Sequence, residues 1–361
     1  MEFGRGALEV LVVNPERWQG RRVFVTGHTG FKGCWLTLAL RSMGAEVIGY
    51  ALPPPTDINL FDALKLASDV KHIVGDIRDL HLLTKTMVEA EPDTVIHLAA
   101  QSLVRRSYKY PLETYETNVM GTANVLEAVR ATTSVRSVVI VTTDKCYENR
   151  EWLWPYREDE PLGGFDPYSN SKACAELVTS AYRNSFFRER DVHLASARAG
   201  NVIGGGDWAE DRLVPDFFRS TDLGRPVLCR NPSALRPWQH VLEPVSGYLS
   251  LCEALFGRGE EVAEAWNFGP SEDDAKPVGW VLDRLTHLYG GAGWVRDGER
   301  HPHEAGLLKL DSSKARQRLD WRPRWRLDEA LSETVAWHSA WRRGEDMRTF
   351  TLQQITRYVG L

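Results

Sequence analysis

The sequence predicts an α/β protein with a doubly wound parallel sheet and a smaller, mixed α/β domain after it. Two observations predict this class. Short apolar runs alternate with helical stretches over residues 21–200, and a glycine-rich turn joins the first run to the first helical stretch. The chain has 361 residues, of which 43% are hydrophobic and 26% charged. This composition is typical of a globular protein with two domains or one enlarged domain.

The predicted elements follow one another at the spacing of β–α–β units. RRVFVTG (21–27) is expected to be a buried strand, and FKGCWLTLALRSMG (31–44) a helix, because its apolar residues recur every three or four positions. The alternation continues through segments 45–52, 59–67, 72–76, 79–90 and 94–100, a helix near 113–131, a strand at 135–143, a helix near 167–187 and a strand at 193–200. Strands separated by such helices predict a parallel sheet covered on both faces.

Beyond residue 200 this alternation loosens. We expect a loop at 203–212, a strand at 226–230, and helices at 213–222, 244–256, 277–289 and 327–342. We therefore divide the chain into a leader (1–20), a first α/β domain (21–200), a mainly substrate-binding domain (201–345) with segments that return to the first domain, and a C-terminal tail (346–361). No flexible linker marks residue 200, so the two domains are expected to pack closely.

Charge and cysteine content exclude several classes of partner. The net charge is −5 and both signs are interspersed, which argues against a nucleic-acid or membrane partner. The five cysteines include no CxxC pair, which argues against a disulfide framework and against a metal site. The apolar run 7–13 contains Glu9 and is too short to span a bilayer. We expect a cytoplasmic protein without a metal.

TGHTGFKG (26–33) is a candidate phosphate-binding loop. Gly27, Gly30 and Gly33 permit a tight turn and close backbone approach, and the following helix offers free N–H groups to a pyrophosphate. A strand-to-helix turn that binds nothing is the alternative, but the flanking strand and helix favour the first interpretation. His28 and Lys32 could contact phosphates or be solvated loop charges. The loop predicts that residues 21–200 form a Rossmann-type dinucleotide-binding domain.

The end of the second predicted strand does not separate NAD from NADP. An acidic residue there would bind the adenosine ribose and favour NAD, whereas an arginine would accommodate a 2′-phosphate. The strand instead ends in Tyr50, Ala51 and Leu52. This position therefore leaves both cofactors open.

DPYSNSKACAEL (166–177) contains a candidate catalytic pair. Tyr168 and Lys172 are four residues apart and so share one face of a helix. A phenol with a usual pKa of ~10 acts as a base near neutral pH only if a nearby cation stabilises its phenolate. Lys172 could do so and also hold the nicotinamide ribose. An ordinary helix pair is the alternative, but a dinucleotide loop and a strand ending in Thr-Thr-Asp favour an oxidoreductase-type site.

These motifs resemble the extended short-chain dehydrogenase/reductase superfamily and, within it, the nucleotide-sugar 4,6-dehydratases. The resemblance covers about residues 20–330 and rests on TGHTGFKG, HLAAQSLV (97–104), TNVMGT (117–122), TTDKCY (142–147), DPYSNSK (166–172), RAGNVIGGGDW (198–208), RPWQHVLEP (236–244) and HEAGLLKLD (303–311). It implies NAD as the cofactor. The residues that would contact NAD are Gly27, His28, Thr29, Gly30, Phe31, Lys32, Gly33, Asp76, Ile77, Leu98, Ala99, Ala100, Ser102, Asn118, Thr142, Tyr168 and Lys172.

The resemblance also implies a reaction. The sugar C4 hydroxyl is oxidised, water is lost across C5 and C6, and hydride returns to C6, which gives a 4-keto-6-deoxy sugar for deoxysugar and surface-polysaccharide synthesis. The implied catalytic residues are Thr143, Asp144, Lys145, Tyr168 and Lys172. The implied substrate-binding residues are Ser102, Thr143, Asn201, Arg212, Arg236 and His240, of which Arg212 and His240 could equally be a surface charge or a cap. Trp208 and Trp238 are expected to pack rather than to stack on a base.

Lys145 differs from the residue that the resembled dehydratases acting on dTDP-glucose carry at this position. The related dTDP-glucose dehydratases carry glutamate after Thr-Asp, whereas a lysine matches the CDP-glucose branch and implies CDP-glucose as the substrate. Asp144 could act as an acid only when protonated, and Lys145 as a base only when neutral. Burial favours both forms, but their mutual attraction opposes them. Lys145 is therefore either the base that removes the C5 proton or a counterion for Asp144 or a substrate phosphate. Both side chains reach one sugar only if the chain leaves the strand near Thr143.

Two other functions stay open. A nucleotide-sugar 4-epimerase or reductase would share the glycine loop, Thr143, Tyr168 and Lys172, but would not need an acid and a base at 144 and 145. A dinucleotide-binding protein without catalysis would need neither Tyr168 nor Lys172. In related folds the helices near 113–131 and 167–187 form a four-helix bundle between subunits, so we expect a homodimer or homotetramer.

Overall fold

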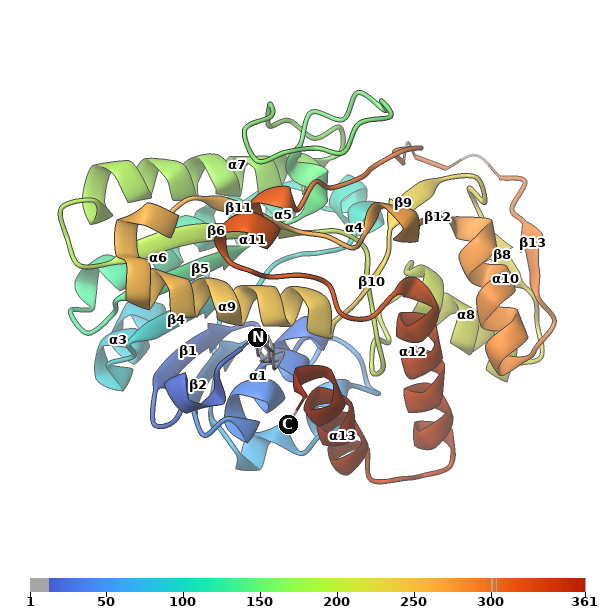
Figure 1. The fold of residues 1–361 in the computed structure, drawn as a ribbon, viewed down its shortest axis with the longest axis horizontal. Coiled ribbons are helices and arrows are strands. Elements are labelled where there is room, and N and C mark those ends of the chain that lie inside the picture. The colour runs from blue at the N-terminus through green and yellow to red at the C-terminus, as the bar shows by residue number, and fades with distance from the viewer. Residues whose placement is uncertain (1–12, 300, 303, 361) are drawn as a thin grey trace, which may run out of the picture.

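The computed structural model describes residues 13–299, 301–302 and 304–360, and its centre is a seven-stranded sheet (Figure 1). The strand order is β11-β6-β5-β4-β1-β2-β3, and all neighbouring strands are parallel. The strands are β1 (Arg22–Thr26), β2 (Glu46–Ala51), β3 (Lys71–Val74), β4 (Thr94–His97), β5 (Ser137–Val141), β6 (His193–Ala199) and β11 (Ala265–Phe268). The strand order reverses between β1 and β4, where open α/β sheets bind ligands. The predicted doubly wound α/β class is confirmed.

Helices cover both faces of the sheet because alternate strand residues point to opposite sides. On one face, Val25 and Val139 belong to a core shared with α1 (Phe31–Ser42) and α9 (Leu242–Arg258). On the other face, Phe24 and Val138 belong to a core shared with α3 (Leu80–Ala90) and α6 (Gly121–Ala131). Helix α7 (Pro167–Tyr182) packs beside α6 on this second face. The sheet is therefore buried on both faces.

A second group of elements lies to one side of the sheet (Figure 1). Its core joins α8 (Leu213–Asp222), α10 (Val278–Tyr289) and α12 (Leu327–Arg342). The short strand pairs are β7 (Val202–Ile203) with β10 (Gln239–His240), β8 (Val227–Cys229) with β13 (Trp294–Arg296), and β9 (Leu235–Pro237) with β12 (Ala275–Pro277). The remaining helices are α2 (Leu60–Ala63), α4 (Val104–Lys109), α5 (Pro111–Tyr115), α11 (Ser313–Arg318) and α13 (Met347–Val359). Strand β11 belongs to the seven-stranded sheet and helix α9 packs on that sheet, although both follow residue 200 in the sequence.

Described segments near both ends of the chain pack on the rest of the protein. Residues 1–12 lie outside the described residues, but Trp18 is buried and its Nε1 donates to Glu253 Oε1 over 2.8 Å. The segment expected to be a tail forms α13, which packs on α1 and α12. Tyr358 of α13 is buried and donates to Glu243 Oε2 over 2.6 Å. The buried face of α13 includes the polar residues Thr351 and Gln354 beside Met347, Ile355 and Tyr358, so its apolar pattern in the sequence is weak.

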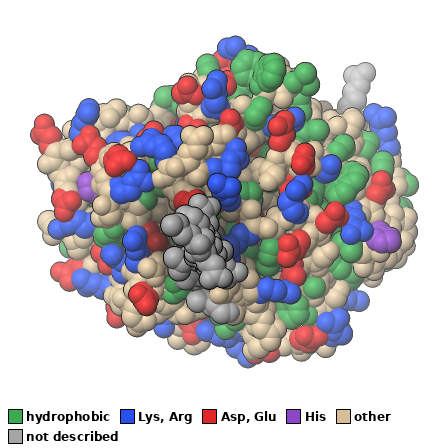
Figure 2. All heavy atoms as spheres, in the orientation of Figure 1, with side chains coloured by type: hydrophobic (Ala, Val, Ile, Leu, Met, Phe, Trp, Pro, Cys, Tyr) green, Lys and Arg blue, Asp and Glu red, His purple; other side chains and the backbone are tan. Residues whose placement is uncertain are grey.

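The surface carries both signs of charge. On the face drawn in Figure 2, Lys and Arg side chains lie among Asp and Glu and do not gather into a stripe. Within the described part of the chain, no helix combines the length and the apolar character needed to cross a membrane.

Candidate active site

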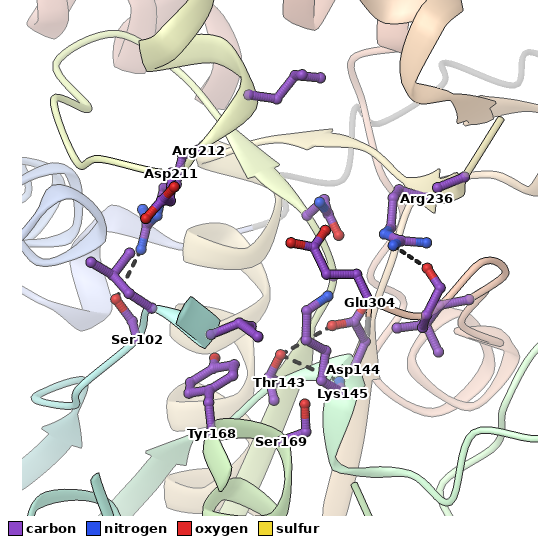
Figure 3. Close-up of a pocket in the computed structure, with 18 of the residues that line it drawn as sticks. Ser102, Thr143, Asp144, Lys145, Tyr168, Ser169, Asp211, Arg212, Arg236 and Glu304 are labelled. Atoms are coloured by element: carbon purple, nitrogen blue, oxygen red, sulfur yellow. Dashed lines mark hydrogen bonds between the residues drawn. The ribbon is translucent and has the colours of Figure 1, made fainter. Parts of the chain in front are cut away.

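A cavity of about 840 Å³ opens beside the ends of β5 and β6. Its wall is built by the loop after β5, the first turn of α7, the segment after β6, and the strands β8 and β9 of the second group. Figure 3 shows Thr143, Asp144, Lys145 and Tyr168 gathered on one side of this space, with Arg212 and Arg236 across it. Four of the predicted catalytic residues therefore line one cavity.

The segment 142–147, called here the 142–147 turn, leaves the sheet as predicted. Strand β5 ends at Val141, and Asp144–Cys146 form a single 3₁₀ turn. Thr143 caps this turn, because its Oγ1 accepts a hydrogen bond from Lys145 N over 3.4 Å. The same hydroxyl donates to Asp144 Oδ1 over 3.0 Å. The tight turn breaks the strand alternation and lets Asp144 and Lys145 both line the cavity.

Asp144 and Lys145 are neighbours but form no ion pair. Asp144 is 1% exposed, and its Oδ2 has no hydrogen-bond partner among the described residues. Lys145 is half-buried, and within the described ranges no carboxylate pairs with its amine. The counterion arrangement between Asp144 and Lys145 is therefore not formed in this structure. Asp144 Oδ2 is left free to exchange a proton with a bound group.

Tyr168 and Lys172 are placed by the start of α7. Asp166 caps the helix, with its carboxylate accepting from Ser169 N over 2.9 Å. Burial raises the pKa of Tyr168 to about 12, although the Thr143 hydroxyl and the Arg212 charge act in the opposite direction. Lys172 is 5% exposed and donates to the carbonyl oxygen of Val141 over 3.2 Å.

Three cations lie close to one another in this part of the structure. Lys32, in the first turn of α1, lines the cavity, and burial together with the charges of Arg212 and Lys172 lowers its pKa to about 8. Burial likewise lowers the pKa of Lys172 to about 8. Arg212 donates to Asp207 Oδ2 and to Ser102 Oγ, each over 2.9 Å. A cation at a helix N-terminus is unfavourable. The arrangement therefore favours a bound anion between these groups.

The glycine loop approaches its neighbours closely. Gly27 has a φ of +75°, and a Cβ there would lie 2.6 Å from Ala99 N. A Cβ on Gly33 would lie 2.1 Å from the carbonyl oxygen of Gly27. Gly30 is the N-cap of α1, with no side-chain hydrogen bond at this end of the helix. No side chain caps this helix N-terminus, which fits the diphosphate of a dinucleotide.

Several predicted cofactor residues act on the protein itself. His28 is fully buried, packs on Gly49, and its Nε2 lies 2.7 Å from His72 Nδ1. Burial, and then the charge of His72, lower the pKa of His28 to about 3. Its side chain is neither a phosphate ligand nor a solvated charge, which corrects both expectations. Asn118 Nδ2 donates over 2.9 Å both to the carbonyl oxygen of Gln101 and to Ser171 Oγ, and so holds the segment after β4.

The remaining predicted cofactor residues are placed as follows. Leu98 and Ala99 donate their N–H groups to Thr26 Oγ1, which fixes the start of the 98–102 segment beside the glycine loop. Asp76 accepts from Arg78, and Ile77 is buried against Gly121. Thr29, Ala100, Ser102 and Thr142 lie in the loops at the ends of β1, β4 and β5, and Phe31 is the first residue of α1. Of these, Phe31, Ser102 and Thr142 line the cavity.

Of the predicted substrate residues, His240 is not at the cavity. Its ring is fully buried, with its centre 5.5 Å from that of Trp35 and 4.8 Å from that of Trp325. The prediction for His240 is corrected, because the pairing of β10 with β7 turns this side chain into the core. Asn201 and Arg236 do line the cavity, and Arg236 is held by the carbonyl oxygens of Leu235 and Ala305.

Trp208 and Trp238 pack as expected. The ring of Trp208 lies edge-on to Trp337 and Trp341, with ring centres 5.7 and 5.4 Å away. Trp238 is 4% exposed and donates to the carbonyl oxygen of Lys276.

Sequence reasoning missed four charged residues on the cavity wall that are joined by ion pairs. Arg230 Nη1 lies 3.4 Å from Glu304 Oε1 and 3.7 Å from Asp211 Oδ1. Arg105, from α4 next to the sheet, reaches the same Asp211 oxygen over 2.9 Å. Glu304 belongs to the quoted motif HEAGLLKLD, so that motif was the available signal, but the pairing depends on contacts between distant segments.

Comparison with known proteins agrees with this site. Residues 24–260 match the family model described as GDP-mannose 4,6 dehydratase. The CDP-glucose 4,6-dehydratase of Salmonella typhimurium is 54% identical over 354 residues, covering 96% of this chain and 99% of that protein. The dTDP-glucose 4,6-dehydratase DesIV of Streptomyces venezuelae, solved with NAD, has a TM-score of 0.74 at 26% identity, covering 90% of this chain and 98% of that one.

A further solved structure supports the fold. An epimerase of Methanothermobacter thermautotrophicus has a TM-score of 0.78 at 24% identity, covering 94% of this chain and 98% of that one. The family match spans the glycine loop, the 142–147 turn and the Tyr168–Lys172 pair. The chain belongs to the GDP-mannose 4,6-dehydratase family.

Proposed function

We propose that this protein is a hydro-lyase that converts CDP-glucose to CDP-4-keto-6-deoxyglucose with NAD as its cofactor. The observation that carries the proposal is the meeting of Thr143, Asp144, Lys145 and Tyr168 on one cavity. A 4-epimerase needs the first and last of these groups but has no step for the acid and base between them. The 54% identity to the Salmonella typhimurium enzyme along nearly its whole length supports CDP-glucose as the substrate.

The surroundings of the glycine loop support NAD. Gly27 and Gly33 let the loop pack closely against Ala99 and against its own first turn, and Lys32 and Lys172 supply positive charge nearby. NAD, when bound, supplies a reversible hydride acceptor for the sugar C4. Binding its diphosphate would relieve the repulsion among Lys32, Lys172 and Arg212 that the protein otherwise carries. The NAD-containing DesIV structure, 26% identical, supports the same choice.

In the first step Tyr168 takes the proton of the C4 hydroxyl, and Thr143 Oγ1 hydrogen-bonds the same oxygen. Because the pKa of Tyr168 is about 12 in the protein alone, the phenolate requires stabilising cations. Lys172, with a pKa of about 8, is mostly an ammonium ion at neutral pH, and Arg212 adds a second positive charge. Oxidation of C4 to a ketone then acidifies the proton on C5.

In the second step Lys145 removes the C5 proton and Asp144 protonates the departing C6 hydroxyl. The absence of an ion pair between the two side chains within the described residues supports this division. The free Oδ2 of Asp144 is the atom suited to donate the proton. Lys145 projects into the cavity from the same turn, so both groups can act on adjacent carbons of one sugar. General acid and base catalysis of this kind contributes about 10²–10⁴-fold each.

The substrate diphosphate is assigned to Arg236, Asn201 and Arg212, because guanidinium groups match phosphate oxygens in shape and charge. Arg236 is 7% exposed and still lines the cavity, so its charge is directed inward. The cavity volume of about 840 Å³ suits a nucleotide-sugar.

The test is a substrate panel. Purified protein is incubated separately with CDP-glucose, dTDP-glucose, UDP-glucose and GDP-mannose, and products are identified by mass and by the alkaline ultraviolet absorbance of 4-keto-6-deoxy sugars. We expect loss of one water from CDP-glucose and the fastest turnover with this nucleotide. Preferred turnover of another nucleotide would refute the substrate assignment, and a C4 epimer with unchanged mass would refute the dehydratase assignment.

We further propose a cytoplasmic protein that forms a homodimer or homotetramer through α5, α6 and α7. Leu112 of α5, Met120 directly before α6 and Leu177 of α7 are 76%, 57% and 58% exposed, which is unusual for large apolar side chains. The described cysteines are all free thiols, which is typical of a reducing compartment. Sedimentation of a monomer, unaffected by Leu177→Glu, would contradict the oligomer.

A further inference from the structure

A buried ion pair lies behind the cavity, and the proposed chemical steps do not use it. Glu176 and Arg198 are each 3% exposed, and Arg198 Nη2 lies 2.8 Å from Glu176 Oε2. Glu176 is on α7, one turn beyond Lys172, and Arg198 is on β6. Removing two charges from water is unfavourable, and their attraction does not reliably compensate for it. Stability alone therefore does not explain the pair.

The carboxylate of Glu176 holds the start of the 142–147 turn. Its Oε1 accepts a hydrogen bond from Thr142 Oγ1 over 2.5 Å, and its Oε2 accepts from Ser196 Oγ over 2.7 Å. Burial by itself would raise the pKa of Glu176, but Arg198 and these hydroxyls lower it, so the carboxylate is ionised. Thr142 is the first residue of the turn and directly precedes Thr143. Its hydrogen bond to Glu176 therefore links the start of the turn to α7.

The guanidinium of Arg198 holds the other end of the same turn. Its Nη1 donates to the Tyr147 hydroxyl over 2.8 Å and to the carbonyl oxygen of Glu158 over 3.1 Å. The guanidinium carbon lies 4.9 Å from the centre of the Tyr147 ring. The Tyr147 hydroxyl in turn donates to Asn267 Oδ1 of β11 over 2.7 Å. The two members of this ion pair therefore hydrogen-bond the first and the last residue of the turn, Thr142 and Tyr147.

We propose that Glu176 and Arg198 are positioning residues that fix the 142–147 turn against helix α7. This inference rests on the proposed function. Tyr168, on α7, takes the proton at C4 of the sugar with Thr143 of the turn beside it, whereas the acid and base at C5 and C6, Asp144 and Lys145, both lie on the turn. The two steps use the same bound sugar, so the turn and the helix must keep a fixed relative placement. A misplacement of about 1 Å at a reacting group costs about 10²-fold in rate.

The test removes each of these two hydrogen bonds to the turn and leaves the ion pair in place. Thr142→Val deletes the hydroxyl bonded to Glu176, and Tyr147→Phe deletes the one bonded to Arg198, both with little change in volume. Tyr358→Phe is the matched control, because it also deletes a buried hydroxyl, bonded over 2.6 Å to a glutamate outside the site. Three quantities are measured on the full-length holoenzyme with CDP-glucose: the rate of C4 oxidation from NADH absorbance in a single turnover, the rate of water loss by mass, and Tm.

We expect water loss to fall about 10- to 100-fold relative to C4 oxidation in both site variants, with the 4-keto sugar that retains its C6 hydroxyl accumulating. Tyr358→Phe lowers Tm and leaves the ratio of the two rates unchanged. An unchanged ratio of the two rates in either folded site variant, whether both rates fall equally or neither falls, overturns the positioning role. If a site variant does not fold, Arg198→Lys is measured in its place, because it keeps the charge but not the guanidinium fork. The same fall in the ratio of water loss to C4 oxidation is expected, and an unchanged ratio overturns the positioning role.

The test separates the two proposals. A wild-type protein that converts CDP-glucose, alongside site variants with an unchanged ratio, overturns only the positioning role. A wild-type protein that turns over no CDP-glucose overturns the proposed function and this inference with it.

Discussion

Replacing Lys32 by methionine tests the interpretation that burial and two neighbouring cations make the charged form of this lysine unfavourable in the folded protein. The pKa of this side chain falls from 10.5 to about 8 in the folded protein, because of burial and the charges of Arg212 and Lys172. The difference of about 2.5 units, at 1.36 kcal/mol for each unit, is an upper limit of about 3 kcal/mol of destabilisation by the charged lysine at neutral pH. Water in the cavity screens part of it, so we expect Lys32→Met to stabilise the nucleotide-free protein by about 1–3 kcal/mol.

The stabilisation by Lys32→Met should depend on pH, because the lysine loses its proton at a lower pH in the folded protein than in the unfolded chain. Below about pH 8 the lysine is charged in both the folded and the unfolded state, so the charged side chain lowers the free energy of unfolding by its full amount. Between about pH 8 and 10.5 the unfolded chain still binds the proton while the folded protein has lost it, so the wild type gains stability as pH rises. The advantage of Lys32→Met should therefore shrink across this window.

The assay is urea unfolding of nucleotide-free protein at several pH values, with NAD affinity measured by calorimetry. Lys85→Met, on an exposed part of α3, is the matched control and should change stability by less than about 0.5 kcal/mol. Lys32→Met should bind NAD more weakly although it is more stable. A variant that is less stable at neutral pH, or one whose advantage is the same at pH 7 and at pH 11, would refute the reasoning.

Three further predictions concern the chemistry and the cofactor. Lys145→Met should keep C4 oxidation but lose exchange of solvent deuterium into C5 by about 10²-fold or more, and unimpaired exchange would remove Lys145 from the role of base. Tyr168→Phe should lower the rate of C4 oxidation by about 10²–10⁴-fold while CDP-glucose still binds by calorimetry; oxidation at the wild-type rate would exclude the phenol. Gly33→Ala, whose Cβ would lie 2.1 Å from the carbonyl oxygen of Gly27, should destabilise the protein by about 1–3 kcal/mol and lose NAD on purification. Wild-type NAD content and Tm would contradict this close approach.

Local sequence signals predicted the sheet and much of the cavity. The glycine loop, the strand ending in Thr-Thr-Asp and the Tyr168–Lys172 spacing each combine a side-chain type with a nearby element boundary, and such boundaries are set by neighbouring residues. The exit of the chain from β5 near Thr143 was predicted on another ground, because Asp144 and Lys145 could reach one sugar only if the strand ended there. These features needed no knowledge of distant contacts.

Features that depend on distant contacts could not be read in this way. His28 stands inside the glycine loop, but its ring turns away to fill the space above Gly49 and to meet His72. His240 stands in a family motif, but the β7–β10 pairing turns it into a cluster of tryptophan rings. Which side of the backbone each histidine takes depends on segments far away in the sequence.

The buried ion pair was missed for a related reason. Glu176 and Arg198 lie on separate elements, and only the packing of α7 on β6 brings them together. In the sequence each is one charged residue among many, and no local pattern joins them.

The most direct measurement follows one atom through the reaction. CDP-glucose carrying deuterium at C4 is converted by the protein, and the product is analysed by NMR and mass spectrometry. The account predicts that the deuterium appears at C6 of a 4-keto-6-deoxy product within the same molecule, while C5 takes up hydrogen from solvent. Recovery of the deuterium at C4, in a product of unchanged mass with inverted C4, would contradict it.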